Sequence, residues 1–169
     1  VLISGPTALK PPVCGDKIKT VKINSAAQMQ KAVLAEYEDC DVVIKAAAVA
    51  DYRVECQSPV KIKKNDENMT LKLVKNPDIL KNLGRCKTHQ ILVGFAAETN
   101  DLLAYAKKKL QEKNLDMIVA NDVSRKDAGF DVDTNVITII KADGTVKEYD
   151  KNTKEQAAEN ILDAVYPLL

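Results

Sequence analysis

The segment from Val42 to Lys64 constrains the fold more than any other part of the chain. It begins with the apolar run Val42–Ile44, which alanines at positions 46, 47 and 48 continue. Such a run is typical of a parallel strand that helices cover on both faces, because these strands read as continuous hydrophobics. In open α/β sheets, ligands bind at the carboxyl ends of the strands. We therefore expect an α/β fold with a ligand site directly after this strand.

Charged side chains follow the expected strand. Asp51 offers a hydrogen-bond acceptor, Arg53 offers a forked donor, and Lys61, Lys63 and Lys64 bring positive charge. This combination suits a phosphate-bearing ligand, because cationic side chains form strong charge-assisted hydrogen bonds to phosphate oxygens. Lysines on this segment equally suit the solvated face of an edge strand, where they prevent aggregation. Both interpretations of Lys63 and Lys64 stay open.

Length and charge exclude several classes of protein. A chain of 169 residues is expected to form one domain, 1–169, that buries roughly 70% of its unfolded surface. With 25 basic and 24 acidic residues, 4% aromatic residues and no tryptophan, nucleic acid is an improbable partner. Neither a bilayer-length apolar run nor a signal-peptide pattern occurs. We expect a soluble, cytoplasmic protein with no nucleic-acid or membrane partner.

The cysteines and the single histidine offer little catalytic chemistry. Cys14, Cys40, Cys56 and Cys86 are widely spaced and form no CxxC motif, and His89 is the one histidine. Zinc sites use closer pairs, so we interpret these cysteines as reduced packing thiols. A Ser/His/Asp hydrolase would depend on His89 alone. Neither GxGxxG nor GxxxxGK[ST] occurs, which disfavours a dinucleotide fingerprint and a P-loop.

Apolar periodicity predicts strands and helices in alternation. Expected strands cover 1–4, 19–23, 42–44, 91–95 and 117–120, and two hairpins pair 60–64 with 69–74 and 135–140 with 145–149. Expected helices cover 25–38, 101–114 and 153–166, and a further one opens at 75–79. The inward residues should be Met29, Val33, Leu34, Tyr37, Leu102, Leu103, Ala106, Leu110, Ala157, Ile161, Leu162 and Val165. This order predicts a three-layer, Rossmann-like (ribokinase-like) α/β sandwich with a mostly parallel sheet and an inserted hairpin flap at about 58–74.

Polar residues recur where strands end and helices begin. Asn76 suits a helix cap, Pro77 the first helical position and Asp78 the first turn, and a helix amino terminus is a ready anion site. The same three residues are also ordinary helix-start residues. The polar residues Glu98, Thr99, Asn121 and Asp122 follow later strands, and Lys109 and Lys113 lie one helical turn apart.

Five segments, in this order, resemble the bacterial phosphopantothenate-cysteine ligase family. They are AAVADYR (47–53), KIKK (61–64), KNPDIL (75–80), GFAAET (94–99) and KNLDMIVAND (113–122). In many bacteria this ligase is the carboxyl-terminal domain of a bifunctional flavoprotein of coenzyme A biosynthesis. The resemblance covers nearly the whole chain.

The resemblance implies a reaction and a set of small molecules. The carboxylate of 4'-phosphopantothenate would attack the α-phosphorus of CTP and form an acyl-cytidylate, which the amine of cysteine would then attack. Mg²⁺ would neutralise the triphosphate, and FMN would be expected only on a fused or associated phosphopantothenoylcysteine decarboxylase half. Independently of the resemblance, a homodimer through the flap hairpin is expected, because the segment 60–74 is too small to bury its own apolar face.

The resemblance also implies roles for particular residues. Lys61, the first lysine of KIKK, matches the lysine that forms the acyl-cytidylate. The positions that match nucleotide contacts are Ala46, Ala47, Asp51, Lys61, Asn76, Pro77, Asp78, Ile79, Phe95, Lys109 and Lys113. The resemblance implies no particular metal ligands.

The chain departs from the family pattern at its start. Members of the family begin with a further β-α unit that carries an asparagine for converting the acyl-cytidylate, whereas Val1–Leu9 aligns with their second strand. We therefore expect an amino-terminally truncated ligase domain. Two alternatives stay open: a non-catalytic nucleotide-binding or assembly domain, and a different Rossmann-type nucleotide enzyme.

Overall fold

The chain divides into two compact units. The computed structural model describes residues 1–12, 15, 17–63, 68–98, 102–122 and 134–169. Val1–Ala35 and Ala47–Asp78 make up the first unit, and Glu36–Ala46 and Ile79–Leu169 make up the second. A single domain over 1–169 stays a prediction.

The first unit begins with a small parallel sheet and a helix. Strands β1 (Leu2–Ser4) and β2 (Thr20–Lys22) pair in parallel, and helix α1 (Ala26–Tyr37) follows them. The helix begins where the sequence predicts, because the Ser25 hydroxyl accepts the backbone N–H of Gln28 at 3.2 Å. The Gln28 side chain in turn accepts the N–H of Asn24 at 2.7 Å. Reciprocal bonds of this kind satisfy donors that a helix start leaves unpaired.

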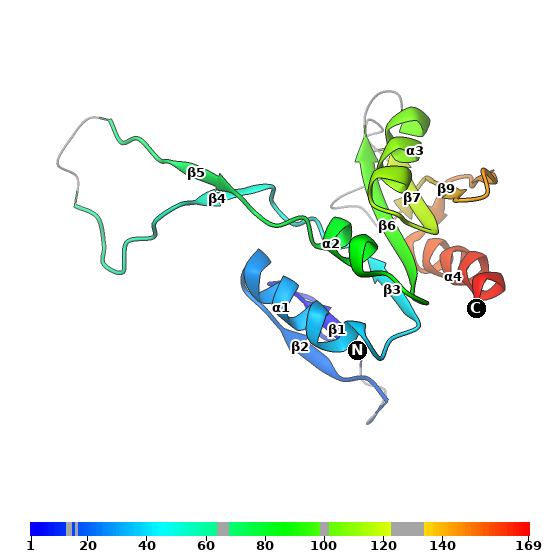
Figure 1. The fold of residues 1–169 in the computed structure, drawn as a ribbon, viewed down its shortest axis with the longest axis horizontal. Coiled ribbons are helices and arrows are strands. Elements are labelled where there is room, and N and C mark those ends of the chain that lie inside the picture. The colour runs from blue at the N-terminus through cyan, green and yellow to red at the C-terminus, as the bar shows by residue number, and fades with distance from the viewer. Residues whose placement is uncertain (13–14, 16, 64–67, 99–101, 123–133) are drawn as a thin grey trace. The chain divides into compact units, whose positions relative to one another are not determined.

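The rest of the first unit is a ribbon of two antiparallel strands, β4 (Tyr52–Val54) and β5 (Leu73–Lys75). Figure 1 shows these strands side by side. We call residues 52–75 the arm. The predicted pairing of 60–64 with 69–74 is wrong, because 60–63 lie outside any strand and β5 pairs with β4 instead. Lys64 and most of the predicted turn lie outside the described residues.

The mispaired hairpin has a physical cause. Alternation indicates which face a side chain takes, but register is strongly specified only where one face is buried. Here Val60, Ile62, Met69 and Leu71 are all exposed, so burial does not determine which segment each of these segments pairs with.

The second unit contains the main sheet. Its strand order is β10-β9-β7-β6-β3, with β3 (Val42–Lys45), β6 (Ile91–Glu98), β7 (Met117–Asp122), β9 (Ile137–Lys141) and β10 (Val146–Glu148). Strands β3, β6 and β7 run parallel to one another. Strand β9 is antiparallel to β7, and β10 is antiparallel to β9. Short strands β8 (Thr134–Asn135) and β11 (Asn152–Thr153) form a separate pair. The prediction of a mixed α/β fold with a mostly parallel sheet is confirmed.

Helices cover both faces of this sheet. They are α2 (Ile79–Cys86), α3 (Leu102–Glu112) and α4 (Lys154–Val165), with a 3-10 turn, η1, at Tyr166–Leu168. The core under α4 consists of Ile91, Val93, Met117, Val119, Ile137, Ile139, Ala157, Ile161 and Val165. On the opposite face, Gly94 approaches Leu80 and Leu115 so closely that a Cβ would lie 2.8 Å from each. Helix α2 and the α3–β7 connection therefore pack on that face.

Several residues predicted to be inward are exposed. Leu34, Leu103 and Leu162 all lie on the outer side of their helices, Leu162 with 57% of its surface exposed. On α4 the buried positions are spaced by four, so Leu162 is rotated by roughly 100° from Ile161. Ile44 is 41% exposed, although a strand covered on both faces was predicted. Strand β3 forms an edge of the five-stranded sheet, which a continuous apolar run cannot reveal.

None of the helices that the structure describes combines the length and the hydropathy needed for a membrane span.

Candidate nucleotide site

Two segments that the sequence singles out meet at the base of the arm. The backbone N–H of Asn76 donates to the carbonyl of Asp51 at 2.7 Å, and its side-chain NH2 donates to the carbonyl of Ala50 at 2.8 Å. The first bond extends the ladder one pair beyond Tyr52 and Lys75. The AAVADYR and KNPDIL motifs are thus joined within the first unit.

Arg53 completes this junction. Its Nη1 donates to the carbonyl of Lys75 at 2.7 Å and to Oδ1 of Asn76 at 3.3 Å. The guanidinium therefore binds the protein itself, although the sequence suggested a donor for a ligand.

The predicted start of the following helix is wrong. Helix α2 begins at Ile79, so Asn76 does not cap it and Pro77 and Asp78 precede it. The side chain of Asn76 is instead bonded to Ala50 and Arg53, which are distant in sequence. The residue preferences of helix starts concern neighbouring positions only, so they cannot predict such distant hydrogen-bond partners.

The remaining candidates in the first unit are at the surface. Ala47, Asp51, Lys61 and Lys63 are exposed, and Lys61 lies in an irregular part of the arm. Exposure leaves the carboxylate of Asp51 and the ammonium of Lys61 accessible to a ligand. Pro77 is half-buried and Asp78 is exposed.

The candidates in the second unit differ in what they can offer. The side chain of Ile79 is 2% exposed, so only its backbone remains for a ligand. Ala46 is exposed just after β3, and Phe95 is half-buried on the α4 face of β6. Lys109 and Lys113 are half-buried at the end of α3, where the N–H of Lys113 donates to the carbonyl of Lys109 at 3.1 Å.

Asn121 is a residue that the sequence placed at a strand end without giving it a role. It pairs with Ala97 across β6 and β7, two positions beyond the pair of Phe95 and Val119. Its Oδ1 is buried, and no hydrogen-bond donor in the described part of the chain reaches it; the same holds for Asn135. A buried acceptor without a donor indicates a missing partner such as water or a ligand. The feature of the sequence that could have pointed to Asn121 is an amide side chain directly after a buried strand.

Some predicted polar residues cannot be placed. Thr99 and the side chains of Glu98 and Asp122 lie outside the described residues.

Three of the four cysteines lie among the described residues. Cys40, Cys56 and Cys86 are free, and Cys14 lies outside the described residues. Burial raises the pKa of the Cys40 thiol, whose Sγ lies 3.2 Å from the carbonyl of Tyr37. A raised pKa lowers the thiolate fraction, so Cys40 is a poor nucleophile.

Within the described ranges, no group of three or more His, Cys, Asp or Glu side chains could hold a metal ion. Mg²⁺ that accompanies phosphates needs only one or two protein carboxylates. The exposed carboxylate of Asp51 meets that requirement.

Comparison with known proteins supports a family assignment. Residues 1–168 match the family model described as the DNA/pantothenate metabolism flavoprotein C-terminal domain. The chain is 48% identical, over 99% of its length, to the coenzyme A biosynthesis bifunctional protein CoaBC of Bacillus subtilis (strain 168), of which it spans 41%. It thus covers about two fifths of that relative's length.

Solved structures show the same fold. The crystal structure of the C-terminal domain of a coenzyme A biosynthesis bifunctional protein CoaBC is similar with a TM-score of 0.79 and 43% identity, covering 97% of this chain and 71% of that one. The DNA/pantothenate metabolism flavoprotein from Streptococcus pneumoniae gives a TM-score of 0.80 at 22% identity, over 99% of this chain and 80% of that one. The second likeness concerns the fold alone. Together with the match over almost its whole length, these similarities show that the chain belongs to the DNA/pantothenate metabolism flavoprotein C-terminal domain family.

Proposed function

We propose that this chain carries a phosphopantothenate-cysteine ligase activity that uses CTP. The family match over 1–168 and the 48% identity to a bifunctional protein of coenzyme A biosynthesis support the pathway. The structural observation that carries the proposal is the junction at Asn76, which joins the acid segment at Asp51 to the segment at 76–79. The five motifs of the resemblance add the nucleotide and the reaction.

The proposed reaction has two steps. The carboxylate of 4'-phosphopantothenate attacks the α-phosphorus of CTP, which forms an acyl-cytidylate and releases pyrophosphate. The amine of cysteine then attacks the acyl carbon, and CMP leaves as the amide forms. Activation replaces a poor leaving group with a good one.

The residues of the chain would bind the nucleotide and stabilise charge. Lys61 would place its ammonium against the phosphoryl oxygens in the first step, because charge-assisted bonds to phosphate are strong. The nucleotide contacts we assign are Ala46, Ala47, Asp51, Asn76, Pro77, Asp78, Ile79, Phe95, Lys109 and Lys113. Mg²⁺, when bound with CTP, would neutralise part of the triphosphate charge, and the exposed carboxylate of Asp51 is a group that could bind it.

Assembly is part of the proposal. The arm exposes apolar side chains on a ribbon that is too small to bury them itself. A second copy of the chain would cover them and give a homodimer. A fused or associated decarboxylase half, carrying FMN, is proposed from the family resemblance, and the name of the relative describes it as bifunctional.

Pyrophosphate release tests the activity directly. The protein is given 4'-phosphopantothenate, Mg²⁺ and either CTP or ATP, with and without cysteine. We expect release with CTP in the absence of cysteine, because activation precedes cysteine attack. Lys61→Gln should reduce the rate about 100-fold, the usual effect of removing one charge-stabilising donor from a reacting site. Lys31→Gln, an exposed lysine of α1, is the matched control and should leave the rate unchanged.

The test separates the competing functions. CTP binding without pyrophosphate release would support a non-catalytic nucleotide-binding domain. Binding of NAD(H) in place of CTP would support a different Rossmann-type enzyme. An unchanged rate for Lys61→Gln would remove Lys61 from the mechanism while leaving the ligase activity in place.

A further inference from the structure

The junction at the base of the arm contains a residue to which the proposed reaction gives no role. Arg53 donates through Nη1 to the Lys75 carbonyl at 2.7 Å and to the Asn76 carboxamide at 3.3 Å. We call Ala50, Asp51, Arg53, Lys75 and Asn76 the arm clasp.

Asn76 makes three hydrogen bonds in this clasp. Its N–H bonds to the Asp51 carbonyl, its NH2 to the Ala50 carbonyl, and its Oδ1 accepts from Arg53. Both polar groups of the side chain are thus bonded to the protein, the NH2 to Ala50 and Oδ1 to Arg53. The carboxamide therefore holds the protein together here, and the 76–79 segment would offer a nucleotide its backbone and Asp78.

Arginine suits this position for a geometric reason. Nη1 carries two N–H groups in the guanidinium plane, and it donates to the Lys75 carbonyl and to Oδ1 of Asn76 at once. A lysine ammonium is a compact point charge on a flexible stem, so it holds two such acceptors less firmly. Both bonds are charge-assisted, which makes them stronger than bonds between neutral groups.

The ribbon needs such a clasp. Strands β4 and β5 pair over three residues each, and an isolated two-stranded hairpin of this size is marginally stable in water. Beyond the ladder, Glu55 and Lys72 add an ion pair at 2.9 Å, but both side chains are exposed and such pairs contribute little. The clasp therefore adds side-chain restraints to the short ladder at the Asp51 end of the ribbon.

We propose that Arg53 is a positioning residue that, through Asn76, holds the Asp51 segment and the 76–78 segment in one arrangement before CTP binds. The proposal rests on the proposed function, in which both segments contact the nucleotide. When the competent arrangement is populated only in part, the apparent affinity falls by that fraction. Arg53 thus sets CTP affinity without touching the reacting atoms.

The experiment compares Arg53→Ala and Arg53→Lys with the unsubstituted protein. We expect the KM and the calorimetric Kd for CTP to rise roughly five- to tenfold for Arg53→Ala and by less for Arg53→Lys, with kcat within about twofold. Lys72→Gln removes one positive charge from the same ribbon outside the clasp and is the matched control. Its KM for CTP should stay unchanged.

Two readouts do not depend on catalysis. Amide hydrogen exchange at Asn76 should become faster in Arg53→Ala, because that N–H is bonded inside the clasp. Adding Asn76→Ala to Arg53→Ala should raise Kd less than the two single changes predict together, since both remove the same restraint.

The outcomes are decisive. A fall in kcat with KM unchanged would place Arg53 at the reacting atoms and overturn the positioning role. Faster exchange at Asn76 with an unchanged Kd for CTP would overturn the link between the clasp and the nucleotide. Failure of the proposed function is a separate result, seen as absent pyrophosphate release from the unsubstituted protein.

Discussion

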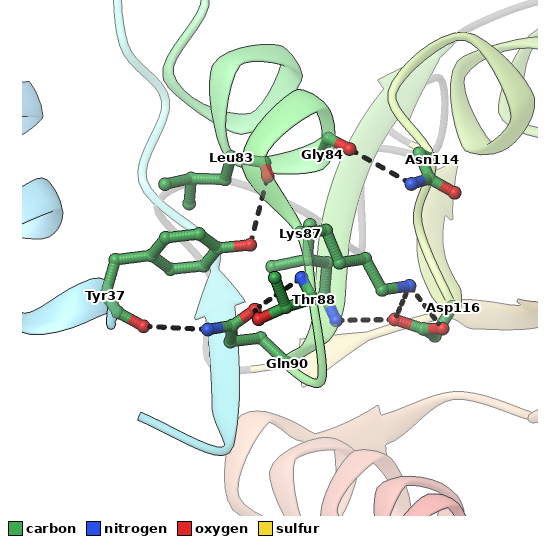
Figure 2. Close-up of polar contacts among 9 residues, drawn as sticks. Tyr37, Leu83, Gly84, Lys87, Thr88, Gln90, Asn114 and Asp116 are labelled. Atoms are coloured by element: carbon green, nitrogen blue, oxygen red, sulfur yellow. Dashed lines mark hydrogen bonds and ion pairs between the residues drawn. The ribbon is translucent and has the colours of Figure 1, made fainter. Parts of the chain in front are cut away.

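Tyr37 shows how one side chain joins elements of the second unit. Its hydroxyl donates to the carbonyl of Leu83 at 3.0 Å, and its own carbonyl accepts from Nε2 of Gln90 at 3.2 Å (Figure 2). Tyr37 and Gln90 are both buried, so these bonds are shielded from water. Burial, followed by nearby acidic groups, raises the pKa of Tyr37 to about 12. The hydroxyl therefore keeps its proton, and can donate, throughout the neutral range.

Replacement of Tyr37 by Phe should change both stability and its dependence on pH. Losing the donor leaves the Leu83 carbonyl unpaired, which costs about 1–2 kcal/mol at pH 8. The pKa is about 12 in the folded protein against 10.0 for the unperturbed group. The protonated hydroxyl therefore stabilises the fold fully below pH 10, and this contribution is lost as the pH rises toward 12. Urea unfolding between pH 8 and pH 11 measures both effects.

The matched control is Tyr105→Phe, because Tyr105 is half exposed on α3. We expect its unfolding midpoint to follow that of the unsubstituted protein at every pH. The prediction fails if Tyr37→Phe loses stability with pH as steeply as the unsubstituted protein does.

At the scale of elements, α2 and the end of α3 are fitted to each other. A Cβ on Gly84 would lie 1.9 Å from the carbonyl oxygen of Lys113, so α2 accepts only glycine at this contact. Asn114 has a φ of 52°, and its side-chain NH2 donates to the carbonyl of Gly84 at 3.0 Å (Figure 2). The N–H of Leu115 bonds to the carbonyl of Leu110 at 3.0 Å, as in a Schellman ending. The left-handed conformation of Asn114 thus ends α3, while its side chain binds a backbone carbonyl of α2.

Substitutions at this contact should rank in a defined order. Gly84→Ala should destabilise the protein by roughly 3 kcal/mol, because the backbone of Lys113 must move. Asn114→Gly keeps the left-handed backbone and loses one hydrogen bond, at about 1 kcal/mol. Asn114→Ala loses the bond and adds the left-handed strain, together about 2–3 kcal/mol. Denaturant unfolding at neutral pH measures all three.

The comparison of Asn114→Gly with Asn114→Ala is internally controlled, since both lack the carboxamide. Equal stability of the two variants would contradict a left-handed Asn114, and an unchanged Gly84→Ala would contradict the close approach of Lys113.

A second contact pins the amino ends of β6 and β7. The carboxylate of Asp116 accepts Lys87 Nζ at 2.6 Å and the N–H of Leu92 at 2.7 Å (Figure 2). Its backbone N–H and carbonyl bond to Leu92 and Ala142, respectively. The polar contacts drawn in Figure 2 lie near the starts of β6 and β7.

At the scale of the whole molecule, the arm has the most unusual surface. Its exposed apolar side chains are Tyr52, Val60, Ile62, Met69, Leu71 and Leu73. Monomeric proteins rarely expose apolar residues in such density, and patches of this kind mark interaction sites. This surface is the basis of the proposed homodimer.

Light scattering at micromolar concentration tests the dimer. We expect about twice the chain mass of 18.5 kDa for the unsubstituted protein. The double variant Ile62→Asp, Leu71→Asp should give the monomer mass, because two buried charges would be unpaired at the interface. Leu162→Asp, at an equally exposed leucine of α4, is the control and should stay dimeric. A mass of 18.5 kDa for the unsubstituted protein would contradict the proposal.

Local signals made several elements predictable. Ser25 precedes α1 and Thr153 caps α4, whose capping box with Gln156 needs only neighbouring residues. The hairpin predicted to pair 135–140 with 145–149 is found as β9 and β10, and Gly144 between these strands has a φ of 90°. Interactions within about four residues do not depend on the rest of the fold, so sequence patterns report them well.

The sequence predicted which segments form the candidate site, but it did not predict which residues of these segments contact one another. Motifs drew attention to Asp51, Arg53 and Asn76, but they suggested a ligand donor at Arg53 and a helix cap at Asn76. The actual bonds join residues more than 20 positions apart in the chain. The buried acceptor of Asn121 depends likewise on which strands surround it.

The sequence by itself determined the α/β class, the order of elements, the family and the residues that deserve testing. Those properties follow from periodicity, capping and motif spacing, which are encoded within short stretches. Only the tertiary structure decided that β5 pairs with β4, that Ile44 lies on an edge strand, and that Arg53 and Asn76 bond to the protein itself. The physical reason is that pairing and burial are set by competition among distant segments for the same hydrogen-bonding groups and the same core.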